Sequence, residues 1–230
     1  MLRTRARRWA VAGVAAAAVL TAAASWLALA RVPSWYRPPH VGAAQYQDVR
    51  DDLELAFNQL NLAMQGDESF DYVVQEGRLN RWIDAREQIW PGLRRYVPPE
   101  LQWPMVTFRE DGVVVAGVVR IGAVRSVLSV TVSVRAEPDR LVVKLERCRL
   151  GALPVPHWVV RRFLEAMSRS APSLSTGRPG DLLDGLVLLN RFDWPNGARR
   201  LRITAIDVRP GRLVATIHPS SARQDRVLWR

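Results

Sequence analysis

The stretch MVTFREDGVVVAGVVRIGAVRSVLSVTVSVRAEPDRLVVKLERCRL, residues 105–150, decides the fold. It is rich in valine, and turn signals at Asp111-Gly112 and Pro138-Asp139 divide it into runs of strand length. Strands joined by connections this short pair with antiparallel neighbours, because a parallel pair needs a long crossover. The stretch therefore predicts a meander of four antiparallel strands.

The two middle strands of this meander differ in how their side chains alternate. The run 113–121 is apolar on both faces, so it requires cover on both sides or a ligand on one side. The run 124–135 instead separates an apolar face from a polar one. The apolar face holds Val124, Leu128, Val130, Val132 and Val134, and the polar face holds Arg125, Ser129, Thr131, Ser133 and Arg135.

Helical patterns precede the meander. Apolar residues recur at helical spacing through residues 46–65, and Gly66 ends that run. A second helix is predicted for residues 76–90. It ends near Trp90, because Pro91 disfavours helix at the residue before it. Residues 70–75, FDYVVQ, predict a short strand between the two helices.

After the meander, the stretch GALPVP at residues 151–156 predicts a corner, because its prolines cannot extend a ladder of hydrogen bonds. We expect a helix from near His157 to about Arg169, a short helix at 181–189 and a loop at 190–197. A final hairpin turns at Pro210-Gly211. Strands clustered between helices, with antiparallel connections, predict an α+β fold.

The N-terminus carries a candidate membrane span. Residues 9–30 are uncharged and long enough to cross a hydrocarbon core of about 30 Å. Four arginines precede this span and Arg31 follows it, which predicts a cytoplasmic N-terminus and an extracytoplasmic remainder at the cell membrane. Cleavage at Ala28-Leu29-Ala30 as a signal peptide is the alternative, but signal peptides have shorter apolar cores, so we favour an uncleaved anchor.

This interpretation divides the chain into five parts. They are a cytoplasmic tail (1–8), a transmembrane anchor (9–30), a Pro-rich juxtamembrane linker (31–45), an extracytoplasmic α+β domain (46–219) and a C-terminal tail (220–230). Trp35 and Tyr36 follow the span closely, and we expect them to lie at the membrane interface.

Charge and composition argue against several functions. The formal net charge is +11, but the basic residues form no long block, and we expect no nucleic-acid partner. Cys148 is the single cysteine and the three histidines lie far apart, so we expect no metal site. No nucleotide-binding or catalytic motif is present, so we expect neither a cofactor nor a catalytic residue.

Five residues are candidates for ligand binding: Trp82, Arg86, Trp158, Phe163 and Trp194. Arg86 interrupts the apolar side of its helix, where it either extends past Trp82 to solvent or grips an anionic headgroup at the mouth of an apolar groove. Phe163 lies on the inward side of the helix after the corner. Trp158 points outward from it and either packs on the sheet edge or contacts lipid or ligand; Trp194 has the same two interpretations.

Three stretches also resemble a known family: EGRLNRWIDAR (76–86), CRLGALPVPHWVVRRFL (148–164) and FDWPNGARRLRITAIDVRPGRLVATIHP (192–219). Together with the N-terminal span, they are similar to the bacterial YpmS-like group of single-pass membrane-anchored proteins, over most of residues 46–219. None of these three stretches is a catalytic motif. Its domain is similar in outline to tubular lipid-binding domains, which implies a strongly curved sheet around a long helix and an apolar groove.

The resulting hypothesis is a non-enzymatic, membrane-anchored domain that binds a lipid or another apolar ligand between its sheet and helices. A protein–protein interaction subunit of a cell-envelope or secretion complex is the alternative, with Trp158 and Trp194 meeting the partner. An enzyme acting on envelope glycan or lipid comes third, and it would require perturbed carboxylates in a cleft.

Overall fold

The computed structural model describes residues 2–91, 101–122, 124–156, 158–161, 185–194 and 199–220, without the side chains of 2–12, 121, 194, 199 and 220. Before the meander come α1 (Leu2–Ala30), a 3-10 turn (Ala43–Gln45), α2 (Tyr46–Gln65), β1 (Phe70–Gln75), α3 (Glu76–Asp84) and α4 (Arg86–Ile89). The meander consists of β2 (Gln102–Arg109), β3 (Gly112–Ile121), β4 (Val124–Ala136) and β5 (Arg140–Leu150). It is followed by β6 (Leu153–Pro154), β7 (Leu186–Leu189), β8 (Phe192–Trp194), β9 (Arg199–Arg209) and β10 (Arg212–Ser220).

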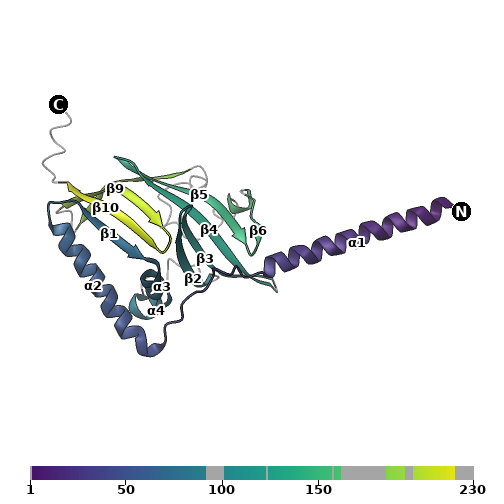
Figure 1. Ribbon diagram of the computed structural model, residues 1–230, viewed down its shortest axis with the longest axis horizontal. Coiled ribbons are helices and arrows are strands. Elements are labelled where there is room, and N and C mark those ends of the chain that lie inside the picture. Colours follow the sequence, from purple (N-terminus) through teal and green to yellow (C-terminus); the bar gives the residue numbers. More distant parts are fainter. Residues whose placement is uncertain are drawn as a thin grey trace.

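The strands form two antiparallel sheets, which confirms the predicted α+β fold. The large sheet has the order β2-β3-β4-β5-β6, with β7 pairing along another part of the same edge of β5. The small sheet has the order β1-β10-β9-β8. Figure 1 shows the curved sheets between α2 on one side and the projecting helix α1 on the other. The four-stranded meander and the final hairpin are therefore confirmed.

The large sheet is covered on one face along β3 and on the other along β5, and Val115 on the less covered face of β3 is 39% exposed. Val114 and Ala116 on one face of β3 are buried, and Tyr36 packs against Ala116 from the N-terminal segment. The opposite face of the sheet contributes Leu145 and Cys148 to a second cluster with Val160. The part of the chain that follows α1 is thus one layer of the fold.

The polar face of β4 is more buried than a solvent-facing strand would be. Ser129 and Thr131 are each 7% exposed, whereas Val130 and Val132 of the apolar face are only half-buried. The reason is tertiary: β4 lies in the middle of the large sheet, and residues 31–36 cross it on the polar side.

The segment after α1 is docked on the sheet, and Tyr36 is not the membrane-interface residue that we expected. Only 7% of Tyr36 is exposed, and its hydroxyl donates a hydrogen bond to the Trp103 carbonyl at 2.6 Å. Burial raises the pKa of Tyr36 to about 12. Further along, Val41 is buried with Val49 and Ala85, so the same segment also joins the helices.

Asparagine side chains connect the helices and loops to sheet edges. Asn80 in α3 donates to the Val106 carbonyl at 2.6 Å and accepts from the Val106 N–H at 2.7 Å. Asn190 is 1% exposed and makes the same pair of bonds with Ile203, at 2.7 and 2.9 Å. Each amide therefore replaces the peptide group of a neighbouring strand, which satisfies buried backbone groups.

Three sequence predictions need correction. The second helix of residues 76–90 is divided at Ala85, which is fully buried against Val41 and Val49. Residues 186–189 are a strand rather than the end of a helix, because the edge of β5 at Arg140–Val143 offers unpaired backbone groups. Residues 192–194 form β8 on the edge of the small sheet rather than a loop.

Candidate functional site

The corner after β5 binds the C-terminal end of α1. The Ala152 N–H donates to the Ala28 carbonyl at 2.9 Å, and the Ser126 hydroxyl donates to the Leu29 carbonyl at 2.6 Å. These bonds satisfy carbonyl groups that a helix end leaves without partners. Gly151 has a φ of +59°, and a Cβ there would lie 2.5 Å from both carbonyl oxygens. Glycine is required at this corner because the backbone of α1 approaches so closely.

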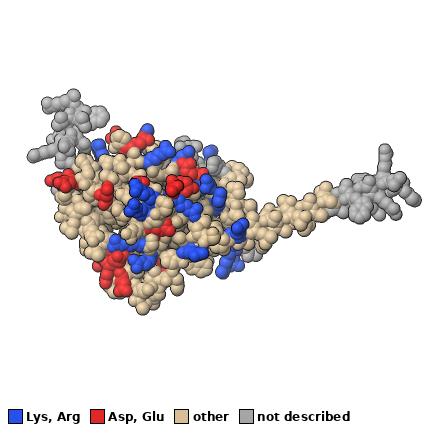
Figure 2. Space-filling view, in the orientation of Figure 1, with Lys and Arg blue, Asp and Glu red and all other residues tan. Residues whose placement is uncertain are grey.

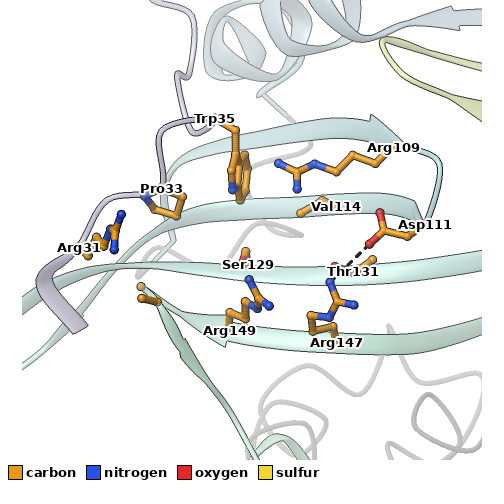
Figure 3. A pocket seen from close by; sticks show the side chains of 12 residues that line it. Arg31, Pro33, Trp35, Arg109, Asp111, Val114, Ser129, Thr131, Arg147 and Arg149 are labelled. Atoms are coloured by element: carbon orange, nitrogen blue, oxygen red, sulfur yellow. Dashed lines mark hydrogen bonds and ion pairs between the residues drawn. The ribbon is translucent and has the colours of Figure 1, made fainter. Parts of the chain in front are cut away.

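A cavity of about 180 Å³ lies next to this junction, between residues 31–35 and the covered face of the large sheet. Figure 3 shows its arrangement, with the N-terminal segment on one side and the side chains of β4 and β5 on the other. We call it the arginine pocket. Its lining comprises Arg31, Pro33, Trp35, Arg109, Asp111, Val114, Ser129, Thr131, Arg147, Arg149, Gly151 and Ala152.

Strand register brings these side chains together. Thr131 of β4 pairs with Arg147 of β5, and Ser129 pairs with Arg149. Paired residues project to the same face of a sheet, so two hydroxyls and two guanidinium groups share one surface. Val114 of β3 pairs with Thr131 on the same surface.

The pocket has an excess of positive charge. Four arginines line it, against the single carboxylate of Asp111, which lies 3.5 Å from the Arg147 guanidinium. The Arg109 guanidinium stacks on the Trp35 ring, 4.5 Å from its centroid. Within the described part of the chain, Arg31 and Arg149 have no carboxylate partner. The pocket can therefore attract and hydrogen-bond an anion, and it repels cations.

Its dimensions limit the size of the ligand. Sites for drug-sized ligands usually enclose about 300–1,000 Å³, so a cavity of about 180 Å³ accepts a small anionic group and not a whole lipid. Guanidinium groups match the planar oxygens of phosphate and carboxylate. Among the described residues, no group of three His, Cys, Asp or Glu side chains could hold a metal ion.

Two of the predicted ligand-binding residues lie together, away from this pocket. The Trp82 indole donates to Asp52 at 3.0 Å, and the Arg78 guanidinium lies over the Trp82 ring. Arg86 donates to the Ile83 carbonyl at 2.7 Å, and its side chain is 16% exposed. Both residues participate in contacts among α2, α3 and α4, at the β2 edge of the large sheet.

Trp158 lies beyond β6, at the opposite edge of that sheet, and is 68% exposed. This exposure agrees with an outward-facing side chain, and contact of Trp158 with lipid or ligand stays a prediction. Trp158 therefore does not share a groove with Trp82 and Arg86. Phe163 and the side chain of Trp194 lie outside the described residues.

The pocket arginines were missed because they come from three separate segments: the chain after α1, β2 and β5. Alternation of Arg147 and Arg149 with apolar residues along β5 is a signal for a polar stripe, and the antiparallel register places it beside Ser129 and Thr131. No pattern in the sequence places Arg31 and Trp35 over that stripe.

No protein-family model and no curated protein matches this chain. The similarity to the YpmS-like group therefore stays a prediction, and the residue roles below rest on the geometry of this chain.

Proposed function

We propose that this protein is a single-pass, membrane-anchored extracytoplasmic domain that binds the phosphate-bearing headgroup of a membrane lipid in the arginine pocket. The observation that carries the proposal is the set of four arginines facing one carboxylate in a small cavity. The proposed ligand is a lipid, as the sequence predicts. The binding site is a polar pocket for the headgroup instead of the predicted apolar groove.

The anchor is supported by how α1 ends. Residues 13–30 form a helix long and apolar enough to cross a membrane, and a signal sequence would pass the same test. Cleavage after Ala30 would remove the Ala28 and Leu29 carbonyls, which the domain binds through Ala152 and Ser126. We infer that α1 is retained, because its last turn is part of the packed structure.

The position of the pocket supports a lipid as the source of the anion. Arg31 follows the last residue of α1 directly, and its side chain lines the pocket. Gly151 and Ala152 of the corner also line the pocket. The pocket therefore begins where the chain leaves the bilayer. A headgroup can enter it while the acyl chains stay in the membrane.

We infer that the pocket binds the headgroup without catalysing a reaction on it. Asp111 is the one carboxylate of the lining, and its pairing with Arg147 suits it poorly to act as a general base. No histidine or cysteine belongs to the lining.

The experiment is native mass spectrometry of the full chain, released from nanodiscs that contain phosphatidylglycerol or phosphatidylcholine. We expect retained phosphatidylglycerol and little phosphatidylcholine. Because a hydrogen bond to a charged group is worth about 1.5–3 kcal/mol, Arg149→Gln should weaken binding by about tenfold or more. Arg212→Gln is the matched control, since Arg212 is an exposed arginine of the small sheet.

A competition arm with inorganic phosphate identifies the source of the anion. Displacement of the lipid by phosphate is expected if both occupy the arginine pocket. Equal retention of the two lipids, or unchanged retention in an Arg147→Gln/Arg149→Gln chain, would show that the pocket does not bind the headgroup.

A further inference from the structure

The end of the domain from which α1 emerges differs in chemistry from the rest of the surface. Trp158 and Val32 are 68% and 60% exposed there. Arg120 and Arg125 pair across the β3–β4 hairpin, next to Ser126, which bonds to α1. We call this surface the rim and define it by six exposed residues: Arg31, Val32, Arg120, Arg125, Trp158 and Arg161.

The rim belongs to segments that contain arginine and no acidic residue. The three stretches 24–37, 117–129 and 149–161 hold no Asp or Glu. Acidic side chains instead gather on α2, which carries Asp48, Asp51, Asp52 and Glu54. Figure 2 shows basic residues where α1 joins the domain, and basic and acidic residues together over the rest of this face. The end of the domain next to α1 is therefore basic, whereas the end that holds α2 carries acidic residues as well.

The contacts of α1 hold the rim in a defined orientation. α1 contacts both β4 and β6, and its last carbonyls are bonded to Ser126 and Ala152. The chain after Arg31 then packs directly on the large sheet through Trp35 and Tyr36. No free spacer separates the helix from the domain, so the direction of α1 also sets the direction of the rim.

We propose that the rim lies on the headgroup layer of the bilayer that α1 spans, with Trp158 inserted at the interface and the arginines facing anionic headgroups. Tryptophan is enriched at this depth, and basic residues are attracted to an anionic surface. The inference rests on the proposed function in one respect, the retained anchor. It adds a second membrane contact, made by the folded domain itself.

This orientation also gives the arginine pocket access to lipid. Arg31 belongs to both the rim and the pocket lining, so one end of the pocket opens at the headgroup layer. The distal lining, Arg109 and Asp111, lies at the far end of the β2–β3 hairpin.

The test measures membrane depth on the full chain in vesicles of phosphatidylcholine and phosphatidylglycerol. An NBD fluorophore is attached at Trp158→Cys, at Arg125→Cys and, as the distal control, at Glu68→Cys after α2. Cys148 is buried, and the parent chain checks that it takes up no label. We expect blue-shifted emission at positions 158 and 125, and several-fold stronger quenching by headgroup-level nitroxide lipids than at position 68.

Water-like emission at both rim positions, equal to that at position 68, would overturn the proposal and favour a protein partner for Trp158. Flotation of the chain with the vesicles shows separately whether α1 anchors the chain in the membrane. Arg149→Gln should weaken headgroup retention by about tenfold or more and leave the quenching at position 158 unchanged, so failure of the pocket and failure of the rim give different results.

Discussion

At the scale of single residues, polar side chains at the contacts between elements determine how the helices attach. Asp52 of α2 accepts hydrogen bonds from the Arg78 guanidinium at 2.8 Å and from the Trp82 indole at 3.0 Å, both on α3. The hydrogen bond from Arg78 is the main reason that the pKa of Asp52 lies below its usual value. Trp82 is therefore a structural residue in this chain.

Asp52→Asn should lower the free energy of unfolding by about 1–2 kcal/mol at pH 7. Because the folded pKa is lowered, the stabilisation is complete above the unfolded pKa of about 4 and is lost as the pH falls through the folded value. The two chains should therefore converge in acid. Denaturant unfolding of the detergent-solubilised chain at several pH values measures this.

Asp51→Asn is the control, since among the described residues Asp51 bonds only to Gln47, on the exposed side of the same helix. It should change stability by less than about 0.5 kcal/mol. An equal effect of the two substitutions would show that the Arg78 and Trp82 contacts contribute nothing.

At the scale of elements, the junction of α1 with the corner depends on Gly151. Its φ of +59° favours glycine, and the α1 carbonyls leave no room for a Cβ. Gly122 in the β3–β4 turn has the same φ of +59°, yet a Cβ there would meet no atom within 4 Å. These two glycines separate the effect of backbone conformation from the effect of contact with α1.

Gly122→Ala should lower the free energy of unfolding by about 1–2 kcal/mol, the usual penalty for alanine in the left-handed backbone conformation. Gly151→Ala should cost more and should also loosen α1, because its methyl group would displace Ala28 and Leu29. Amide hydrogen exchange at Ala152 checks this, since its N–H bonds to the Ala28 carbonyl. Equal exchange in both variants would refute a role of Gly151 in docking α1.

At the scale of the whole molecule, the helix, the connecting segment and the large sheet form one continuous structure. We expect the mature protein to keep residues 2–30, because cleavage after Ala30 would take the Ala28 and Leu29 carbonyls from Ala152 and Ser126. Intact mass measurement of the protein purified from membranes checks this. A mass that begins at Arg31 would contradict the anchor.

The limits of sequence reasoning follow the range of the interactions. Alternation and turn residues are local, so the strands β2–β5, the hairpin β9–β10 and the helix α2 were predictable. β7 and β8 were not, because four and three residues carry too little pattern and their strand state comes from the edges that they join. The pocket could be predicted only in part, through the stripe of Arg147 and Arg149.

The sequence by itself determined the apolar helix, the α+β class, the order of the meander and the sharp corner at Gly151, since each follows from periodicity or from one residue's backbone preference. Only the tertiary structure decided that residues 31–36 lie across β4, that Tyr36 is buried, and that four arginines from three separate segments surround one cavity. Those features arise from contacts between residues up to about a hundred positions apart, such as Leu29 with Ser126, and no local pattern encodes such a pairing.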